Sequence, residues 1–200
     1  MIKNIIFDFG DIFINLDKQI VFKEMEKHGV HDFLPRLTPL NEAFEVGSIG
    51  PEEFLNELHL HFPQVSPTEI KRIWNSMLLD FPEYRLQFLE DLVKQQDYRL
   101  FLLSNTNALH IPHVEQQMGK QQFERFRNCF EQFYLSHEIR LRKPNQEIFE
   151  FVLNENNLKP SETFFIDDSI ENTLAASPLG IKTWNLLVGK EDIISLKERL

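Results

Sequence analysis

The sequence has 200 residues, 42% of them hydrophobic, so we expect one substantial core with room for a smaller insertion. A formal net charge of −10 and a pI of about 5.2 argue against nucleic acid and anionic membrane surfaces as partners. Cys129 is the only cysteine, and no apolar run is long enough for a signal peptide or a membrane span, so we expect a cytoplasmic protein.

The first predicted element is a strand over residues 2–9, because most of this segment is a continuous apolar run. Asp8 lies at its end and Gly10 follows directly. Residues 17–82 then carry apolar side chains at helical spacing, without a strand pattern. We therefore expect a core domain formed by residues 1–15 and 83–200, and an inserted helical cap formed by residues 16–82.

Beyond the insertion, strands alternate with helices. Apolar runs predict strands over residues 99–103, 130–135, 163–166 and 181–187. Repeated helix and strand units indicate a parallel sheet with right-handed crossovers. The expected fold class is α/β, a Rossmann-like doubly wound parallel sheet with an inserted all-helical cap. The nineteen phenylalanines are expected in its packing, and the charged residues between 190 and 199 predict a solvated helix face.

Polar side chains lie at or just beyond the ends of the predicted elements: Asp8, Ser104, Lys143, Asp167 and Asp168. In a parallel sheet these ends share one edge, so we expect them to converge on one crevice, although each alone is also explained as a helix cap or an ion pair. Three carboxylates repel a phosphate dianion, since like charges about 4 Å apart repel by roughly 4 kcal/mol at an effective dielectric constant of about 20. A set of oxygen ligands with room for waters favours Mg²⁺ over zinc as the compensating cation.

In such a crevice Asp8 is the candidate nucleophile, and its attack on phosphorus would give an aspartyl-phosphate. The cation and Lys143 would neutralise charge during the attack. The Ser104 hydroxyl and nearby backbone amides would hold the phosphate oxygens. The expected partner is therefore a small-molecule phosphate ester.

Four segments together resemble the motifs of haloacid dehalogenase-like hydrolases. They are Asp8 after a short apolar strand, Leu103–Asn107, Arg142–Pro144, and Phe165–Asp168 with Asn172. The resemblance covers the whole predicted sheet, and the helical insertion looks like the first type of cap in that family. The nearest resemblance is to the subgroup whose first motif reads Asp-x-Gly-Asn, which includes a phosphatase acting on glucose 1-phosphate.

The resemblance implies a metal site and a phosphate site. Asp8 would be both nucleophile and ligand of Mg²⁺, with the Gly10 carbonyl and Asp168 as further ligands. Asp167 would bind the metal directly or through water, and Asn172 would support the ligands from behind. At the phosphate, the resemblance implies that Ser104 and the backbone amide of Asn105 bind its oxygens, while Lys143 bridges the nucleophile and the phosphate.

One position departs from the family pattern. Most phosphatases of the family carry a second aspartate two residues after the nucleophile as general acid and base, a role worth about 10²–10⁴-fold in rate. Here that position is Gly10. Asp11 is one residue further on and is a weak candidate for the role, and His110 is a weak candidate for a substrate contact.

The expected function is that of a magnesium-dependent phosphomonoester hydrolase acting on a small phosphorylated metabolite, with a sugar phosphate as the suggested substrate. One alternative is an L-2-haloacid dehalogenase, which also lacks the second aspartate and needs no metal. The Asp167-Asp168 pair argues against it, because these carboxylates would repel a carboxylate substrate. The other alternative is a non-catalytic family member that only binds a phosphorylated ligand.

Overall fold

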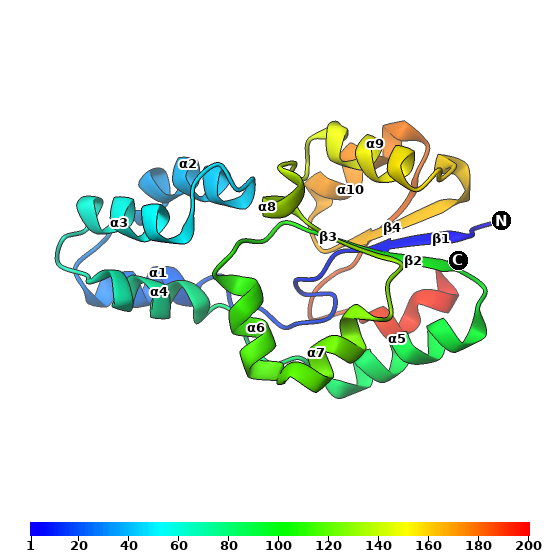
Figure 1. The fold of residues 1–200 in the computed structure, drawn as a ribbon, viewed down its shortest axis with the longest axis horizontal. Coiled ribbons are helices and arrows are strands. Elements are labelled where there is room, and N and C mark those ends of the chain that lie inside the picture. Colours follow the sequence, from blue (N-terminus) through cyan, green and yellow to red (C-terminus); the bar gives the residue numbers. More distant parts are fainter.

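The computed structural model describes the backbone of residues 1–200 and every side chain except that of residue 36. Its centre is a sheet of five parallel strands in the order β3-β2-β1-β4-β5 (Figure 1). The strands are β1 (Asn4–Phe7), β2 (Arg99–Ser104), β3 (Gln132–Leu135), β4 (Thr163–Asp167) and β5 (Lys182–Asn185). Every one of them overlaps a segment predicted as a strand, although β2 and β4 extend one residue beyond it, and the expected α/β fold is confirmed.

The register of the sheet brings the carboxyl ends of three strands together. Phe7, the last residue of the central strand β1, pairs with Leu102 of β2 and with Ile166 of β4. Asp8 is therefore level with Asp167, which ends β4. Ser104 ends β2 one residue further along the same edge.

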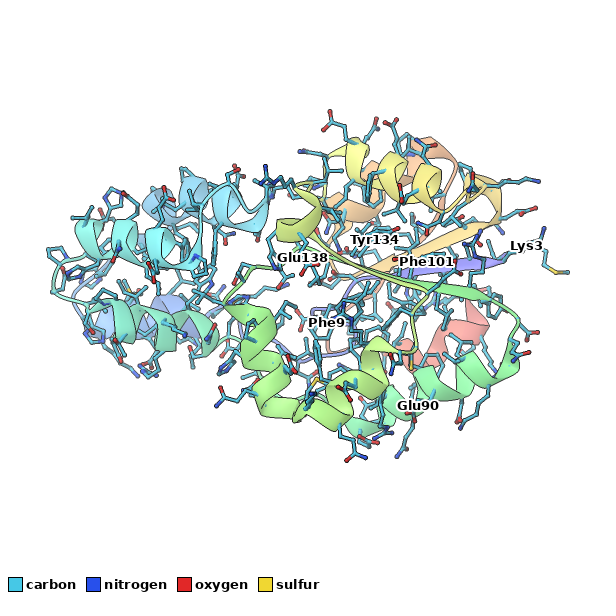
Figure 2. The ribbon with its side chains drawn as sticks, in the orientation of Figure 1. Lys3, Phe9, Glu90, Phe101, Tyr134 and Glu138 are labelled. Carbon is cyan, nitrogen blue, oxygen red and sulfur yellow. The ribbon has the colours of Figure 1, made fainter. Side chains whose placement is uncertain are left out.

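Helices cover both faces of the sheet, which explains why the middle of each central strand is a continuous apolar run. The helices of one face are α5 (Glu83–Gln95), α6 (His110–Met118) and α7 (Lys120–Arg127), and those of the other are α8 (Ser136–Ile139), α9 (Gln146–Glu155) and α10 (Ile170–Ala176). Short 3-10 helices are η1 (Pro160–Glu162), η2 (Ser177–Leu179) and η3 (Ile193–Glu198). Figure 2 shows Phe9 in the layer of α5 to α7 and Tyr134 on the opposite side of the sheet.

Phenylalanines fill the larger of these layers. The ring of Phe126 in α7 contacts five other phenylalanine rings, with centroids 5.0–5.9 Å away. Such contacts add to the stabilisation that burial of the rings already provides. The prediction that the phenylalanines serve packing is confirmed for this layer.

Four further helices lie apart from the sheet (Figure 1). They are α1 (Ile20–Lys27), α2 (Phe33–Glu45), α3 (Pro51–His61) and α4 (Pro67–Asn75), and they enclose a hydrophobic core of their own. In that core Phe44 stacks on Phe54 with centroids 4.3 Å apart, and Trp74 packs against Phe54 at 5.2 Å. The two chain segments that join these helices to the sheet are hydrogen-bonded side by side, with Leu16 opposite Leu78.

The charged residues of the C-terminal segment lie where they were predicted: Lys197, Glu198 and Arg199 are exposed to solvent. Ile193 and Leu196, on the other side of η3, are fully buried against the core. Among the described residues, none of the helices combines the length and the apolarity that crossing a membrane requires.

Candidate active site

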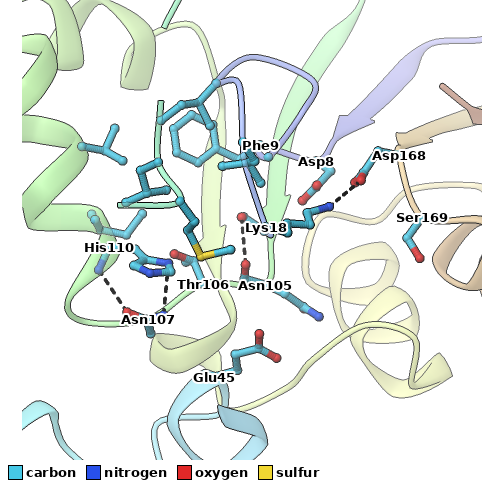
Figure 3. Close-up of a pocket in the computed structure, with 18 of the residues that line it drawn as sticks. Asp8, Phe9, Lys18, Glu45, Asn105, Thr106, Asn107, His110, Asp168 and Ser169 are labelled. Atoms are coloured by element: carbon cyan, nitrogen blue, oxygen red, sulfur yellow. Dashed lines mark hydrogen bonds and ion pairs between the residues drawn. The ribbon is translucent and has the colours of Figure 1, made fainter. Parts of the chain in front are cut away.

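Asp8 lies at the edge of the sheet in a cavity of about 300 Å³. Its backbone amide donates to the carbonyl of Ile166 at 2.9 Å, which extends the pairing of β1 with β4 by one residue and fixes the position of the side chain. The cavity is lined by the carboxyl ends of the strands and by residues of α2, α4 and α6. Figure 3 shows Asp8 and Asp168 on one side of this cavity and His110 with Asn107 on the other.

Lys143 is buried beneath the cavity and ties two carboxylates together. Its Nζ donates to Asp8 Oδ1 at 2.7 Å, to Asp167 Oδ2 at 2.6 Å and to the carbonyl of Leu103 at 2.8 Å. Burial alone would lower the pKa of Lys143, but the charges of Asp167 and Asp8 raise it above its ordinary value. The structure therefore holds a charged ammonium group between the ends of β1, β2 and β4.

Three carboxylates form an acidic cluster: Asp8, Asp167 and Asp168 each offer an oxygen within 4.8 Å of the others. Burial is the main reason that the pKa of Asp8 is raised to about 7; Lys143 opposes the shift, and the charges of Asp167 and Asp168 add to it. A further positive charge at this cluster would favour the ionised carboxylates. Three carboxylates carry more negative charge than Lys143 neutralises, and their oxygen donors fit a magnesium ion.

Asp167 is more fully engaged than the sequence suggested. Its Oδ1 accepts from the Ser169 amide at 2.8 Å and from Asn172 Nδ2 at 3.0 Å, and its Oδ2 accepts from Lys143 and Asn172. The side chain is fully buried. Asn172 thus lies behind Asp167, a candidate metal ligand, and holds its carboxylate in place, which agrees with the position predicted for it.

Asn105 contacts the site through its side chain as well as its backbone. Its Oδ1 accepts from the Lys143 amide at 2.9 Å, and its Nδ2 donates to the Lys143 carbonyl at 2.8 Å. This pair of hydrogen bonds fixes the backbone that carries the ammonium group. Ser104 is buried at the end of β2, lines the cavity, and has only a long contact of 3.5 Å with the Asn105 carbonyl, so its hydroxyl is available to a ligand.

Lys18 is a residue that the sequence reasoning missed. It follows the first connection to the helical segment, and its Nζ lies 2.8 Å from Asp168 Oδ2 and 3.2 Å from Asp11 Oδ2. Burial opposes ionisation, but the hydrogen bond and charge of Asp168 raise the pKa of Lys18 above its ordinary value. A lysine in the connection that leads into α1 carries no periodic signal, so only the structure shows that it reaches the acidic cluster.

Asp11 does not take the place of the missing second aspartate. Its backbone is left-handed, with φ of 56°, and its Oδ1 accepts from the Leu16 amide at 3.1 Å, outside the residues that line the cavity. Gly10 does line the cavity. A Cβ added to it would lie 2.8 Å from Leu16 Cδ1 and 3.9 Å from Asp8 Oδ2.

His110 lines the far wall of the cavity, at the start of α6. It is 9% exposed, and its ring stacks on Trp74 of α4 with centroids 5.3 Å apart. Burial lowers the pKa of His110 to about 4, against a smaller opposing effect of the Trp74 backbone, so that the imidazole is neutral near pH 7. The predicted substrate contact is thus placed in the same cavity as Asp8.

The helical segment contacts the site through α2. Arg142, the residue before Lys143, pairs with Glu45 at 3.0 Å and with Glu42 at 3.3 Å. Glu45 also accepts from Asn41 Nδ2 at 3.0 Å, and both Asn41 and Glu45 line the cavity. Asn41, Glu42 and the contacts of Glu45 were not predicted, because nothing in a helical stripe marks which polar positions face a neighbouring domain.

Three features together are typical of one class of hydrolases: the parallel sheet, the buried lysine between two aspartates, and the acidic cluster. The chain belongs to the haloacid dehalogenase-like hydrolase family, whose model matches residues 2–180. The predicted family membership is confirmed.

Three similar proteins make the comparison more specific. A D-ribitol-5-phosphate phosphatase of Bacteroides thetaiotaomicron is 29% identical over 92% of this chain and 91% of its own. A sesquiterpene phosphatase of Aspergillus oryzae is 26% identical over 90% of this chain and 87% of its own. A family enzyme of Bacteroides thetaiotaomicron, crystallised with magnesium and inorganic phosphate, superposes with a TM-score of 0.84 and 34% identity, covering 96% of this chain and 97% of that one.

Proposed function

We propose that the protein is a magnesium-dependent phosphomonoester hydrolase that acts on a small phosphorylated metabolite through an aspartyl-phosphate at Asp8. The observation that carries the proposal is the buried Lys143, which holds Asp8 and Asp167 at 2.7 and 2.6 Å beside Asp168 in one cavity. The phosphatases among the similar proteins, and the neighbour with magnesium and phosphate bound, support it.

In this proposal an oxygen of Asp8 attacks phosphorus, and the bond from phosphorus to the alcohol oxygen breaks. Lys143 offsets the charge of the nucleophile, and the Ser104 hydroxyl with the Asn105 amide holds the phosphoryl oxygens. Water then cleaves the aspartyl-phosphate, which releases inorganic phosphate and restores Asp8. The helical segment of residues 16–82 is proposed to be the cap that covers the cavity during these steps.

Asp8, Asp168 and the Gly10 carbonyl are the proposed magnesium ligands. Asp167 is assigned a supporting role through water, because Lys143, Asn172 and the Ser169 amide already occupy its oxygens. When bound, the ion supplies positive charge that offsets the repulsion between the nucleophile and the phosphate dianion.

The proposal includes no side chain as general acid. Position 10 is glycine, and Asp11 is turned towards the Leu16 amide and Lys18. The departing alkoxide would therefore take its proton from water in the cavity. We expect esters of good leaving groups to be hydrolysed much faster than esters of ordinary alcohols.

The two alternative functions have less support. An L-2-haloacid dehalogenase would have to bind a carboxylate substrate beside three carboxylates, and a protein that only binds its ligand would have no use for an aspartate placed for attack. A cytoplasmic location, which the lone Cys129 favours, belongs to the same proposal.

The test is release of phosphate from p-nitrophenyl phosphate, with magnesium and with a chelator. We expect activity that requires magnesium and is lost in Asp8→Asn. The control is Asp91→Asn, which changes the same side chain at an exposed ion pair with Lys94 and should leave activity intact. Halide release from 2-chloropropionate without metal would instead establish the dehalogenase, and phosphate binding without turnover would establish the binding protein.

A further inference from the structure

Two lysines reach the acidic cluster, and the structure holds them differently. The side chain of Lys143 is 1% exposed, and its Nζ donates to three oxygens, one of them the backbone carbonyl of Leu103. The side chain of Lys18 is 52% exposed, and its Nζ lies 2.8 Å from Asp168 Oδ2 and 3.2 Å from Asp11 Oδ2. Lys143 is therefore a fixed part of the site, whereas the ammonium group of Lys18 can exchange one carboxylate for the other.

Asp168 is a partner of Lys18 and also a proposed ligand of magnesium. Its carboxylate belongs to the acidic cluster with Asp8 and Asp167. Figure 3 shows the Lys18 side chain extended towards Asp168, beside Asp8. An ammonium group at this carboxylate offsets negative charge that attracts a divalent ion, and it also repels the ion directly. Lys18 and magnesium are therefore expected to compete for Asp168.

The backbone on both sides of Lys18 is held in place. The Asp17 amide donates to the Met77 carbonyl at 2.9 Å, which ties this segment to the second connection between the helical segment and the sheet. Asp17 Oδ1 accepts from the amides of Gln19 and Ile20 at 3.0 and 3.2 Å, at the start of α1. An exchange of partners therefore needs rotation of the Lys18 side chain and no movement of the helices.

Asp11 is placed to hold the ammonium group when it leaves Asp168. Asp11 Oδ1 accepts from the Leu16 amide at 3.1 Å, and the Asp11 amide donates to the Ile14 carbonyl at 2.8 Å, so the carboxylate is fixed in its loop. The other oxygen, Oδ2, is the one near Lys18. Asp11 lies outside the described residues that line the cavity, so it can keep a cation beside the site without binding the metal itself.

We propose that Lys18 is a built-in competitor of magnesium: its ammonium group pairs with Asp168 and moves to Asp11 when the ion binds. This inference rests on the metal site of the proposed phosphatase function, and it adds the residue that sets the affinity of that site. Removal of the Lys18 charge should tighten magnesium binding. A lysine that merely supports Asp168 as a ligand would loosen binding when removed.

The experiment titrates the full chain, stripped of metal with a chelator and dialysed, with magnesium alone and measures Kd by isothermal titration calorimetry. Lys18→Met keeps the length of the side chain and removes the charge. We expect Kd to fall about 3- to 10-fold, because a partly exposed ion pair is weak but its ammonium group also repels the ion. Lys18→Arg keeps a cation and should not lower Kd. As a second readout, magnesium should raise the midpoint of thermal unfolding more in Lys18→Met than in the wild-type protein.

The chain offers a matched control and a test of the second partner. Lys27→Met removes an exposed ion pair with Glu24 in α1 and should leave Kd unchanged. Asp11→Asn removes the second partner of the ammonium group, so it should raise Kd about 3-fold in the wild-type background and less in Lys18→Met. Any direct attraction between the Asp11 charge and the ion is present in both backgrounds, so the difference measures the effect that acts through Lys18.

The possible failures can be told apart. If magnesium binds to the wild-type protein and binding is lost in Asp168→Asn, but Lys18→Met binds the ion equally or more weakly, the competition is wrong and the proposed metal site stands. Equal effects of Asp11→Asn in the two backgrounds would show that Asp11 is not the second partner of Lys18. If the wild-type protein binds no magnesium, the proposed function itself fails and this inference with it.

Discussion

In the described part of the structure, Lys143 carries the only ammonium group between Asp8 and Asp167. Replacing Lys143 by methionine removes this charge and keeps the length of the side chain. The two carboxylates then face each other with oxygens within 4.8 Å. At an effective dielectric constant of about 20, two such charges repel by about 3.5 kcal/mol. Removing one partner of a buried ion pair costs about 3–5 kcal/mol in other proteins, so we expect the free energy of unfolding to fall by that amount without magnesium.

The assay is urea unfolding followed by circular dichroism, in chelator and again with excess magnesium. Magnesium should recover part of the loss in Lys143→Met, because an ion bound to the folded state supplies the missing positive charge. Lys94→Met is the control: Lys94 is exposed, and its loss should leave the unfolding midpoint unchanged. A loss below about 1 kcal/mol in chelator would refute the inferred electrostatics of the site.

Three further predictions concern other residues of the cavity. Folding lowers the pKa of His110 from 6.5 to about 4, so the unfolded chain binds a proton at a higher pH than the folded protein does. The neutral, buried His110 therefore contributes stability that is complete above pH 6.5 and is lost as the pH falls towards 4. Unfolding curves should show about 2 kcal/mol less stability at pH 5 than at pH 7 from this group, and His110→Gln should remove that dependence; equal pH slopes would contradict it. Asn105→Asp places an oxygen against the Lys143 carbonyl in place of a donor, so steady-state kinetics should show kcat lowered by about 10-fold or more. An unchanged kcat would mean that the hydrogen bonds from the Asn105 side chain to the Lys143 backbone are not needed for turnover. Gly10→Asp places a carboxyl group beside Asp8 if the Leu16 methyl moves aside, and it should raise turnover of alkyl phosphates more than that of p-nitrophenyl phosphate; equal effects on both esters would count against a missing acid.

Much of the fold was predictable, because each strand is a short apolar run next to a polar end. Every residue of β1 and β4 is buried, and this is why their apolar runs in the sequence predicted the two strands. The same logic brought Asp8, Ser104 and Asp167 to one edge, and the register of the sheet places them there. Strand ends in a parallel sheet are thus fixed by topology and need no knowledge of side-chain geometry.

The residues that escaped prediction depend on packing between distant segments. Lys18, Asn41 and Trp74 come from the helical segment and its first connection, and they reach the cavity only through the way those helices pack on the core. The apolar stripe of α4 predicts that Trp74 is buried, but it does not show that this residue lines the cavity beside the core. The hydrogen bonds between the Asn105 side chain and the Lys143 backbone join positions 38 residues apart, and no pattern in either segment predicts them.

The most direct test of the proposed mechanism is a search for the phosphorylated enzyme. The wild-type protein is mixed with magnesium and p-nitrophenyl phosphate, quenched in acid within milliseconds, digested and analysed by mass spectrometry. We expect one added phosphoryl group on the peptide that contains Asp8, absent from Asp8→Asn and from samples prepared with chelator. Steady turnover with no phosphoryl group on that peptide, or with one on a different residue, would contradict it.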